Sequence, residues 1–152
     1  MTAMKLPSSR RSVQDNVFQL VKEPIDIPKI TDGVQSPEDG AIIVFEGVVR
    51  NNAKGKAVRF LEYDAYEPMA LKKLEEIGSL ARREFEIRDM AIVHRLGHME
   101  IGECSTVIVV ASAHRGPAVD ACRFAIDKIK EIVPIWKKEF YEDGEVWIEG
   151  TP

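Results

Sequence analysis

Five cationic residues flank one predicted helix in the last third of the chain. Two precede the helix and three lie at or just beyond its end: His114, Arg115, Lys130, Lys137 and Lys138. Each one alone is most simply a solvated charge at a helix end, where the helix dipole favours lysine near the C-terminus. Together they point to anion chemistry, because guanidinium and ammonium groups bind phosphates and carboxylates, and an imidazole can move a proton near neutral pH.

The elements that position these side chains follow from local patterns. Residues 106–111 form a continuous apolar, β-branched run that predicts a buried strand. Gly116-Pro117 marks the turn after it, and Pro117 suits a first helical position, so the sequence predicts a helix over residues 117–132. We therefore expect His114 and Arg115 at a strand-to-helix junction, where free N–H groups can hold an anion, and Lys130 in the last helical turn. The buried stripe of this helix is expected at Ala118, Cys122, Ala125, Ile129 and Ile132.

The rest of the chain alternates between strand and helix patterns. Apolar runs predict strands over residues 17–21, 41–49, 58–66, 90–96 and 145–148, with a bulge near Leu61 where the alternation slips. Pro68 opens a second long helix with one apolar face, and residues 25–33 predict a short helix or turn segment. Connections between paired strands are too short for parallel crossovers. The sequence thus predicts an α+β fold with two layers, a mostly antiparallel sheet packed with two long helices.

Composition limits the classes of protein that fit. The chain has 152 residues, of which 45% are hydrophobic, so we expect one domain over residues 15–152 after a disordered leader over residues 1–14. That leader has no apolar central region, which argues against a secretory signal, and the longest apolar runs are strand-sized, which argues against a membrane protein. A net charge of −4 gives no general nucleic-acid footprint. Two cysteines fit a reduced, cytoplasmic protein better than a disulfide scaffold.

Four blocks of sequence carry a resemblance to a known family. They are Gly-Ala-Ile-Ile-Val-Phe-Glu-Gly-Val-Val-Arg-Asn (residues 40–51), Val-His-Arg-Leu-Gly (93–97), Ser-Ala-His-Arg (112–115) and Ile-Lys-Glu-Ile-Val-Pro-Ile-Trp-Lys-Lys-Glu (129–139). In this order and spacing, over residues 17–148, the chain resembles the large, catalytic subunit of molybdopterin synthase. No single block is diagnostic, and the combination carries the assignment. The resemblance implies a hammerhead-like α/β fold.

The resemblance also implies a reaction and its partners. That family converts cyclic pyranopterin monophosphate to molybdopterin, and it takes two sulfur atoms from the thiocarboxylated C-terminus of a small ubiquitin-like subunit ending in Gly-Gly. Its catalytic subunit carries no redox cofactor. A catalytic-subunit dimer carrying one small subunit at each end, a heterotetramer, is expected.

By the same resemblance, particular residues match the family's motifs. Lys130 and Lys137 are expected to carry catalysis. The substrate-binding set is expected to comprise Val48, Val49, Arg50, His114, Arg115, Lys130, Lys137, Lys138 and Glu139. A lysine acts as base or nucleophile when its pKa is lowered, and clustering with Arg50 and Arg115 would do that. An ordinary surface pair with Asp127 would instead hold Lys130 protonated, for acid or electrostatic work.

Other readings of individual residues remain open from sequence alone. His94 and His98 are four apart, but the pattern around them is strand and turn, which does not place them on one helical face, so no metal is assigned. Cys122 falls on a helix stripe and is expected in the core rather than as a persulfide carrier. The chain as a whole could also be a non-catalytic anion-binding module or a small phosphate-ester hydrolase acting through His114 and Arg115.

The two ends of the predicted helix are far apart. Arg115 and Lys130 are separated by fifteen residues, which in a helix is about 22 Å at about 1.5 Å per residue. A small pterin does not span that distance. We therefore expect a composite site in an isologous dimer, with Lys130 and Lys137 from one chain and His114 and Arg115 from its neighbour.

Overall fold

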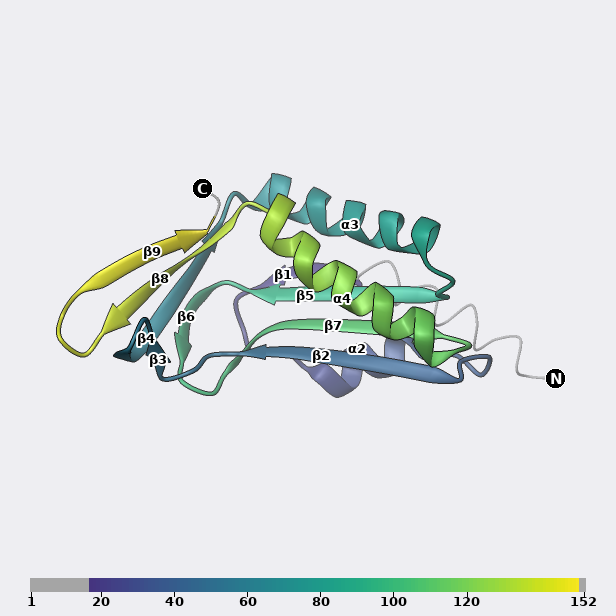
Figure 1. Cartoon of the computed structure of the whole chain (residues 1–152), viewed down its shortest axis with the longest axis horizontal. Coiled ribbons are helices and arrows are strands. Elements are labelled where there is room, and N and C mark those ends of the chain that lie inside the picture. Colours follow the sequence, from purple (N-terminus) through teal and green to yellow (C-terminus); the bar gives the residue numbers. More distant parts are fainter. Residues whose placement is uncertain (1–16, 151–152) are drawn as a thin grey trace.

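The computed structural model describes residues 17–150, so the predicted leader lies outside the described residues. The first of its two sheets has four strands in the order β1-β5-β7-β2 (Figure 1). These strands are β1 (Phe18–Val21), β5 (Asp89–Arg95), β7 (Cys104–Ser112) and β2 (Ala41–Val48). β1 runs parallel to β5, whereas the β5–β7 and β7–β2 pairs are antiparallel.

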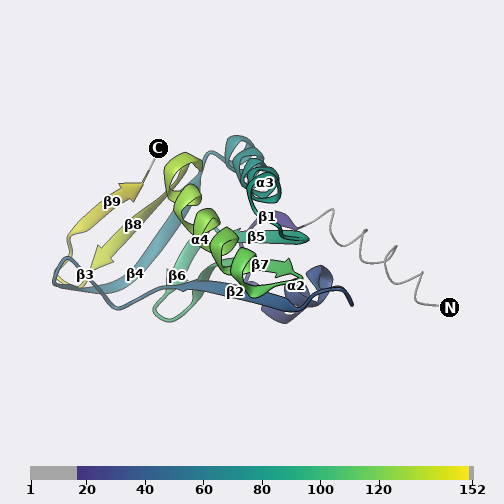
Figure 2. The ribbon, with the colours of Figure 1, turned by 45° about the vertical axis from the view of Figure 1, so that its right-hand side comes forward.

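Helices cover both faces of this first sheet. α3 (Glu67–Glu84) and α4 (Arg115–Ile132) lie over one face, and the short α2 (Ile27–Val34) lies under the other (Figures 1 and 2). Because alternate strand residues point to opposite faces, Ile108 and Val110 of β7 pack with α3 and α4, while Val107 and Val109 pack beside α2. This explains why β7 is a continuous apolar run.

The second sheet is built around β4 (Lys56–Ala65). β4 pairs with β3 (Asn52–Ala53), β6 (Gly97–Glu100) and β8 (Ile135–Tyr141), and β9 (Val146–Gly150) pairs with the far side of β8. This sheet lies beyond the C-terminal end of α4 (Figure 2). The chain passes from α4 into β8 through Val133 and Pro134 only, so the end of the helix is held close to the start of that strand.

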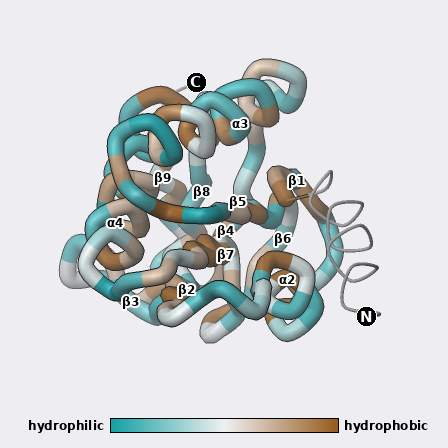
Figure 3. Tube along the Cα trace, turned by 90° about the vertical axis from the view of Figure 1, so that its right-hand side faces the viewer, coloured by the Kyte–Doolittle hydropathy of each residue, from teal (hydrophilic) through white to brown (hydrophobic). Residues whose placement is uncertain are grey.

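Both long helices are amphipathic. Along α3 and α4 hydrophobic and hydrophilic segments alternate (Figure 3). α3 buries Leu74, Ile77 and Ala81 as predicted, and adds Ala70, while Leu71 is only half-buried. α4 buries Ala118, Cys122 and Ala125, so the prediction that Cys122 packs in the core is confirmed.

The α+β class, the largely antiparallel pairing and the two long helices are confirmed. The predicted bulge lies between Val58 and Phe60, just before Leu61. α4 begins at Arg115 rather than Pro117, with Pro117 inside the first turn, where its missing N–H costs no hydrogen bond. Strands β3, β6 and β8 were not predicted. Among residues 17–150, none of the helices combines the length and the apolar character that a membrane crossing requires.

Candidate active site

A cavity of about 440 Å³ lies at the junction between the two sheets and the end of α4. Its walls come from seven elements that are widely separated in sequence. The lining residues are Phe45, Gly47, Val48, Tyr63, His94, Ser105, Thr106, Ile108, Ile126, Ile129, Lys130, Ile135, Lys137, Glu149 and Gly150. The lining thus combines apolar side chains with convergent polar and charged groups, as small-molecule sites commonly do.

Lys130 enters this cavity from the last turn of α4. The surface ion pair between Lys130 and Asp127 that the sequence allowed does not form. The Asp127 carboxylate instead lies 3.9 Å from Arg123 Nε. In the described part of the chain Lys130 has no ion-pair partner. Its ammonium is therefore available to a ligand.

Lys137 enters the same cavity from β8. Alternation along this strand puts Ile135, Lys137 and Glu139 on one face. The Lys137 Nζ lies 3.5 Å from Glu139 Oε2, and its register partner on β9 is Glu149. Lys137 is thus held as the positive member of a charged pair, at a fixed place in the cavity wall.

Glu139 lies beneath this surface rather than on it. Its exposed fraction is 3%, and the Tyr141 hydroxyl donates a hydrogen bond of 2.9 Å to Oε1. Burial, together with this bond to the Glu139 carboxylate, raises the pKa of Tyr141, which keeps the phenol protonated as a donor. Glu139 therefore contacts Lys137 and does not line the cavity itself.

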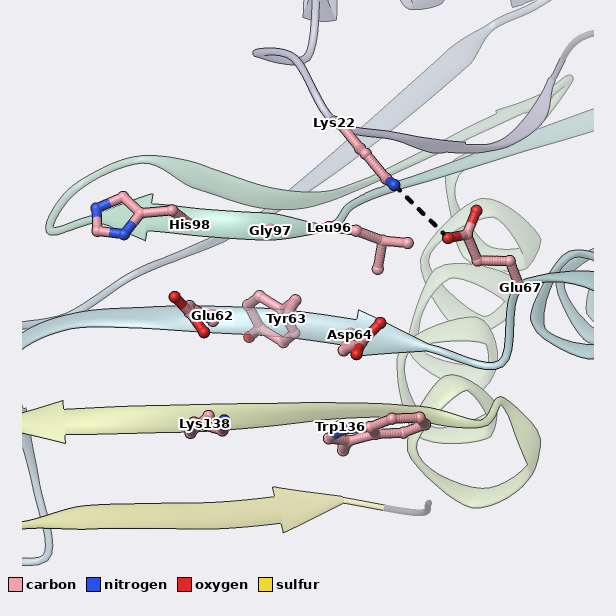
Figure 4. A pocket seen from close by; sticks show the side chains of 10 residues that line it. All are labelled: Lys22, Glu62, Tyr63, Asp64, Glu67, Leu96, Gly97, His98, Trp136 and Lys138. Carbon is pink, nitrogen blue, oxygen red and sulfur yellow. Dashed lines mark ion pairs between the residues drawn. The ribbon is translucent and has the colours of Figure 1, made fainter.

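Lys138 points away from Lys137. It lines a second cavity of about 380 Å³ on the other face of the sheet (Figure 4). There it lies with Glu62, Asp64 and His98 of β4 and β6, and with Trp136 of its own strand. The structure therefore does not bring Lys138 together with Lys130 and Lys137.

The end of β2 contributes the residues expected from the block over residues 40–51. The register of β2 against β7 shifts between Gly47 and Val48, so that Ser105 is left without a partner in the ladder. The Ser105 hydroxyl donates to the Gly47 carbonyl at 3.2 Å. This bulge turns Val48 into the cavity, where its side chain is 56% exposed.

Val49 and Arg50 follow this bulge. Val49 is buried. Its N–H donates to the Glu103 carbonyl at 3.0 Å, and its carbonyl accepts a hydrogen bond from the Gly102 N–H at 2.7 Å. Arg50 is exposed and lies outside the two cavities described above. The anchored backbone of Val49 fixes the point from which Arg50 leaves the sheet.

His114 and Arg115 stand at the junction of β7 and α4, as predicted. Both are exposed, with His114 as the N-cap residue and Arg115 as the first residue of the helix. The fully buried Ser112 holds the junction, because its hydroxyl donates to the Glu86 carbonyl at 2.9 Å and accepts from the His114 N–H at 3.4 Å. The full length of α4 separates this pair from the cavity with the lysines.

Five polar residues of the cavity were not selected from sequence: Tyr63, His94, Ser105, Thr106 and Glu149. His94 lies in the block over residues 93–97, which carried the resemblance, but it was weighed only as a metal ligand. Tyr63 and Glu149 are the cross-strand neighbours of Lys137, a relationship that needs β8 to be known. Residues 17–150 contain no group of three or more metal-ligating side chains.

Known proteins have sequences similar to that of this chain. The family model described as MoaE protein matches residues 20–132. The molybdopterin synthase catalytic subunit of Arabidopsis thaliana is 43% identical over 91% of this chain and 71% of its own length, and that of Bacillus subtilis is 48% identical over 86% and 83%.

Solved structures agree with the sequence matches. The crystal structure of molybdopterin synthase from Staphylococcus aureus superposes with a TM-score of 0.84 at 42% identity, covering 88% of this chain and 97% of that one. A complex of subunits 1 and 2 of the molybdopterin-converting factor from Helicobacter pylori, 23% identical, has the same fold with a TM-score of 0.70, covering 84% and 86%. The chain belongs to the MoaE family, whose curated relatives are molybdopterin synthase catalytic subunits.

Proposed function

We propose that this chain converts cyclic pyranopterin monophosphate to molybdopterin, using two sulfur atoms from the thiocarboxylated C-terminus of a small ubiquitin-like carrier. The observation that carries the proposal is the meeting of Lys130 and Lys137 in one cavity, in a chain of this family. Sequence separates these lysines by a helix end, a proline and a strand start. The fold places both lysines in the lining of the same cavity.

The cavity suits the chemistry of this reaction. Its volume of about 440 Å³ lies within the range of roughly 300–1,000 Å³ typical of small-molecule sites. The thiocarboxylate is an anion, and charge develops on oxygen when its acyl group is transferred from sulfur to water. Two positioned ammonium groups in a largely apolar surround stabilise that charge more strongly than bulk water does.

The sulfur donor is proposed to be a separate protein. An extended tail ending in Gly-Gly has no bulky side chains near its end, so it can enter between strands and present its terminal group to Lys130 and Lys137. The Helicobacter pylori structure of the same fold, a complex of two subunits, supports a small partner.

The substrate phosphate is proposed to bind His114 and Arg115 of a second copy of the chain. These residues start α4, whereas Lys130 lies in its last turn, about 22 Å away at about 1.5 Å per residue. An isologous dimer allows the start of one helix to face the end of the other. Two such composite sites with one carrier each give a heterotetramer, in which Arg50 adds a further cation for the substrate.

The compartment is proposed to be the cytoplasm. Cys104 and Cys122 are both free thiols, and burial raises the pKa of each thiol, so neither is poised as a reactive thiolate. Free, unreactive cysteines are compatible with a reducing environment.

Reconstitution tests the function directly. Purified protein is mixed with the thiocarboxylated carrier and cyclic pyranopterin monophosphate, and dithiolene formation is measured. A synthase forms the dithiolene, an anion-binding module binds the substrate without turnover, and a phosphate-ester hydrolase releases phosphate instead. A carrier lacking its last two residues serves as the matched control. Full turnover with that truncated carrier would show that the tail is not the sulfur donor.

A further inference from the structure

His94 is a polar cavity residue whose side chain is buried from solvent yet keeps an unused hydrogen-bonding atom. It is 4% exposed and lies on β5, on the same face as Met90 and Ile92. Its register partner on β7 is Thr106, which also lines the cavity. The ring is therefore part of the wall that faces Lys130 and Lys137.

The ring is fixed in one orientation by two contacts. Its Nδ1 lies 2.9 Å from the Arg95 carbonyl oxygen, and Tyr63 packs against it edge-on with the ring centroids 4.9 Å apart. A carbonyl oxygen can only accept a hydrogen bond, so Nδ1 must carry the proton. In the neutral ring the other nitrogen, Nε2, is then an acceptor with a free lone pair.

Nε2 has no partner within residues 17–150 and still reaches open space. Among the described residues, Arg95 Nε is the only side-chain nitrogen or oxygen atom that is both fully enclosed and without a hydrogen-bond partner. Since His94 Nε2 also lacks a partner but is not in that class, it is not fully enclosed. Because His94 lines the cavity, we infer that the cavity is the open space which Nε2 reaches.

The ring is neutral at physiological pH. Burial lowers the pKa of His94 from 6.5 to about 4, against a smaller opposing effect of the Arg95 carbonyl. A neutral acceptor differs in kind from the carboxylates nearby, since Glu139 and Glu149 would offset the positive charge of the lysines. His94 accepts a hydrogen bond and leaves intact the positive charge that an anionic substrate needs.

We propose that His94 is a substrate-contacting residue of the synthase, whose Nε2 accepts a hydrogen bond from a ring N–H of the bound pterin. The inference rests on the proposed function. A pterin presents several N–H donors along its edges, and a donor brought into a buried site without an acceptor loses binding energy. His94 supplies that acceptor beside the two lysines, so it contributes to choosing the orientation of the ring.

Two amide variants separate this role from a purely structural one. Asn places its amide near Nδ1, so His94→Asn keeps the donor to the Arg95 carbonyl and loses the acceptor in the cavity. Gln extends its amide to the position of Nε2, so His94→Gln keeps an acceptor in the cavity and loses the donor. We expect His94→Asn to lower kcat/KM for the pterin by about 5- to 100-fold, chiefly through KM, and His94→Gln to stay within a few-fold of the parent protein. The reverse order, or equal activity in both, would overturn the proposal.

A measurement on the unmodified sequence covers the case in which the variants fold poorly. Protein labelled with ¹⁵N at histidine is titrated with cyclic pyranopterin monophosphate in the absence of carrier. We expect the His94 Nε2 resonance to shift as the site fills, while Nδ1 keeps its proton. An unchanged Nε2 resonance at saturation rejects the contact. Failure of the proposed function is distinct, because it would appear as an absence of dithiolene formation in the unsubstituted protein.

Discussion

Lys137 and Lys138 are adjacent in the chain, yet they lie on opposite faces of β8 and line two different cavities. The pleat of a strand is the cause, since successive side chains leave it in opposite directions. Lys137 shares its cavity with Lys130, whereas Lys138 lies beside Glu62, with His98 beyond it on the next strand (Figure 4). The pair therefore offers a matched comparison.

Replacing each of these lysines by alanine should have very different effects on turnover. Removing a positioned charge that acts in the transition state typically costs roughly 100- to 1,000-fold in rate, and we expect that loss for Lys137→Ala. Lys138→Ala should stay within a few-fold, because its charge lies on the other side of the sheet. Rates of dithiolene formation at saturating carrier provide the measurement. Equal losses in two folded variants contradict the separation of the two faces.

Most of the elements could be predicted from sequence, but the junction that forms the cavity could not. β7 is a continuous apolar run, and the helices α3 and α4 have strong apolar periodicity. β8 has none, because Lys137 and Glu139 occupy its cavity-facing side and Lys138 its other side, so that both faces carry charge. Lys130 and Lys137 reach one cavity because the chain turns at Val133 and Pro134, between α4 and β8. Hydrophobic periodicity does not predict the direction of that turn.

The site residues, too, divide into those that the sequence could identify and those that it could not. The resemblance identified Val48, Lys130 and Lys137, which all line the cavity. It also named Glu139, which local sequence could not show to be buried under Lys137. Tyr63 and Glu149 enter only through cross-strand register, a long-range property that a single sequence does not display.

Mixing two inactive variants tests the composite site. In a mixed dimer of Arg115→Ala with Lys130→Ala, one site carries both lesions and the other carries none. With statistical reassortment about half of the dimers are mixed, so roughly a quarter of the parent activity should return.

The control for this experiment mixes Lys130→Ala with Lys137→Ala. Both lysines come from one chain, so every site in that mixture keeps a lesion and no activity should return. Exchange of subunits is verified by mass. If the first mixture stays inactive despite exchange, each site is built within one chain.

Gly40 supports the junction that presents His114 and Arg115. A Cβ atom at this position would lie 2.3 Å from the Ala113 carbonyl oxygen, and the Gly40 N–H already donates to the Ser112 carbonyl at 3.0 Å. Gly40→Ala should therefore destabilise the fold by about 1–3 kcal/mol, because backbone atoms must move.

The matched control is Gly116→Ala, in the first turn of α4. An added Cβ there meets no atom within 4 Å, and alanine favours the helix, so the free energy of unfolding should rise by about 0.4–1 kcal/mol. Urea unfolding of both variants measures the two changes. An unchanged free energy of unfolding in Gly40→Ala would mean that the Ala113 backbone moves aside at no cost, which would contradict the prediction.

The buried His94 ring predicts how stability depends on pH. Its pKa is about 4 in the folded state and about 6.5 when unfolded, so between these values the unfolded chain binds the extra proton. The neutral ring contributes its full stability above pH 6.5, and about 3 kcal/mol is lost as pH falls to 4, at 1.36 kcal/mol per unit.

The His94→Gln variant isolates this effect, since carboxylates elsewhere titrate equally in both proteins. Unfolding free energies measured from pH 4 to 7 should fall more steeply toward acid in the parent protein than in the variant. Parallel curves would show that the ring is protonated or exposed in the folded state.

The central claim is that the lysines of the cavity at the end of α4 perform the sulfur transfer, and one comparison tests it most directly. Lys130→Ala and Lys72→Ala each remove an exposed helical lysine, the first from the cavity and the second from the outer face of α3. The rate of dithiolene formation from thiocarboxylated carrier and cyclic pyranopterin monophosphate is measured for both folded proteins. We predict a loss of roughly 100- to 1,000-fold for Lys130→Ala and almost none for Lys72→Ala. Equal rates in the two variants would contradict the account.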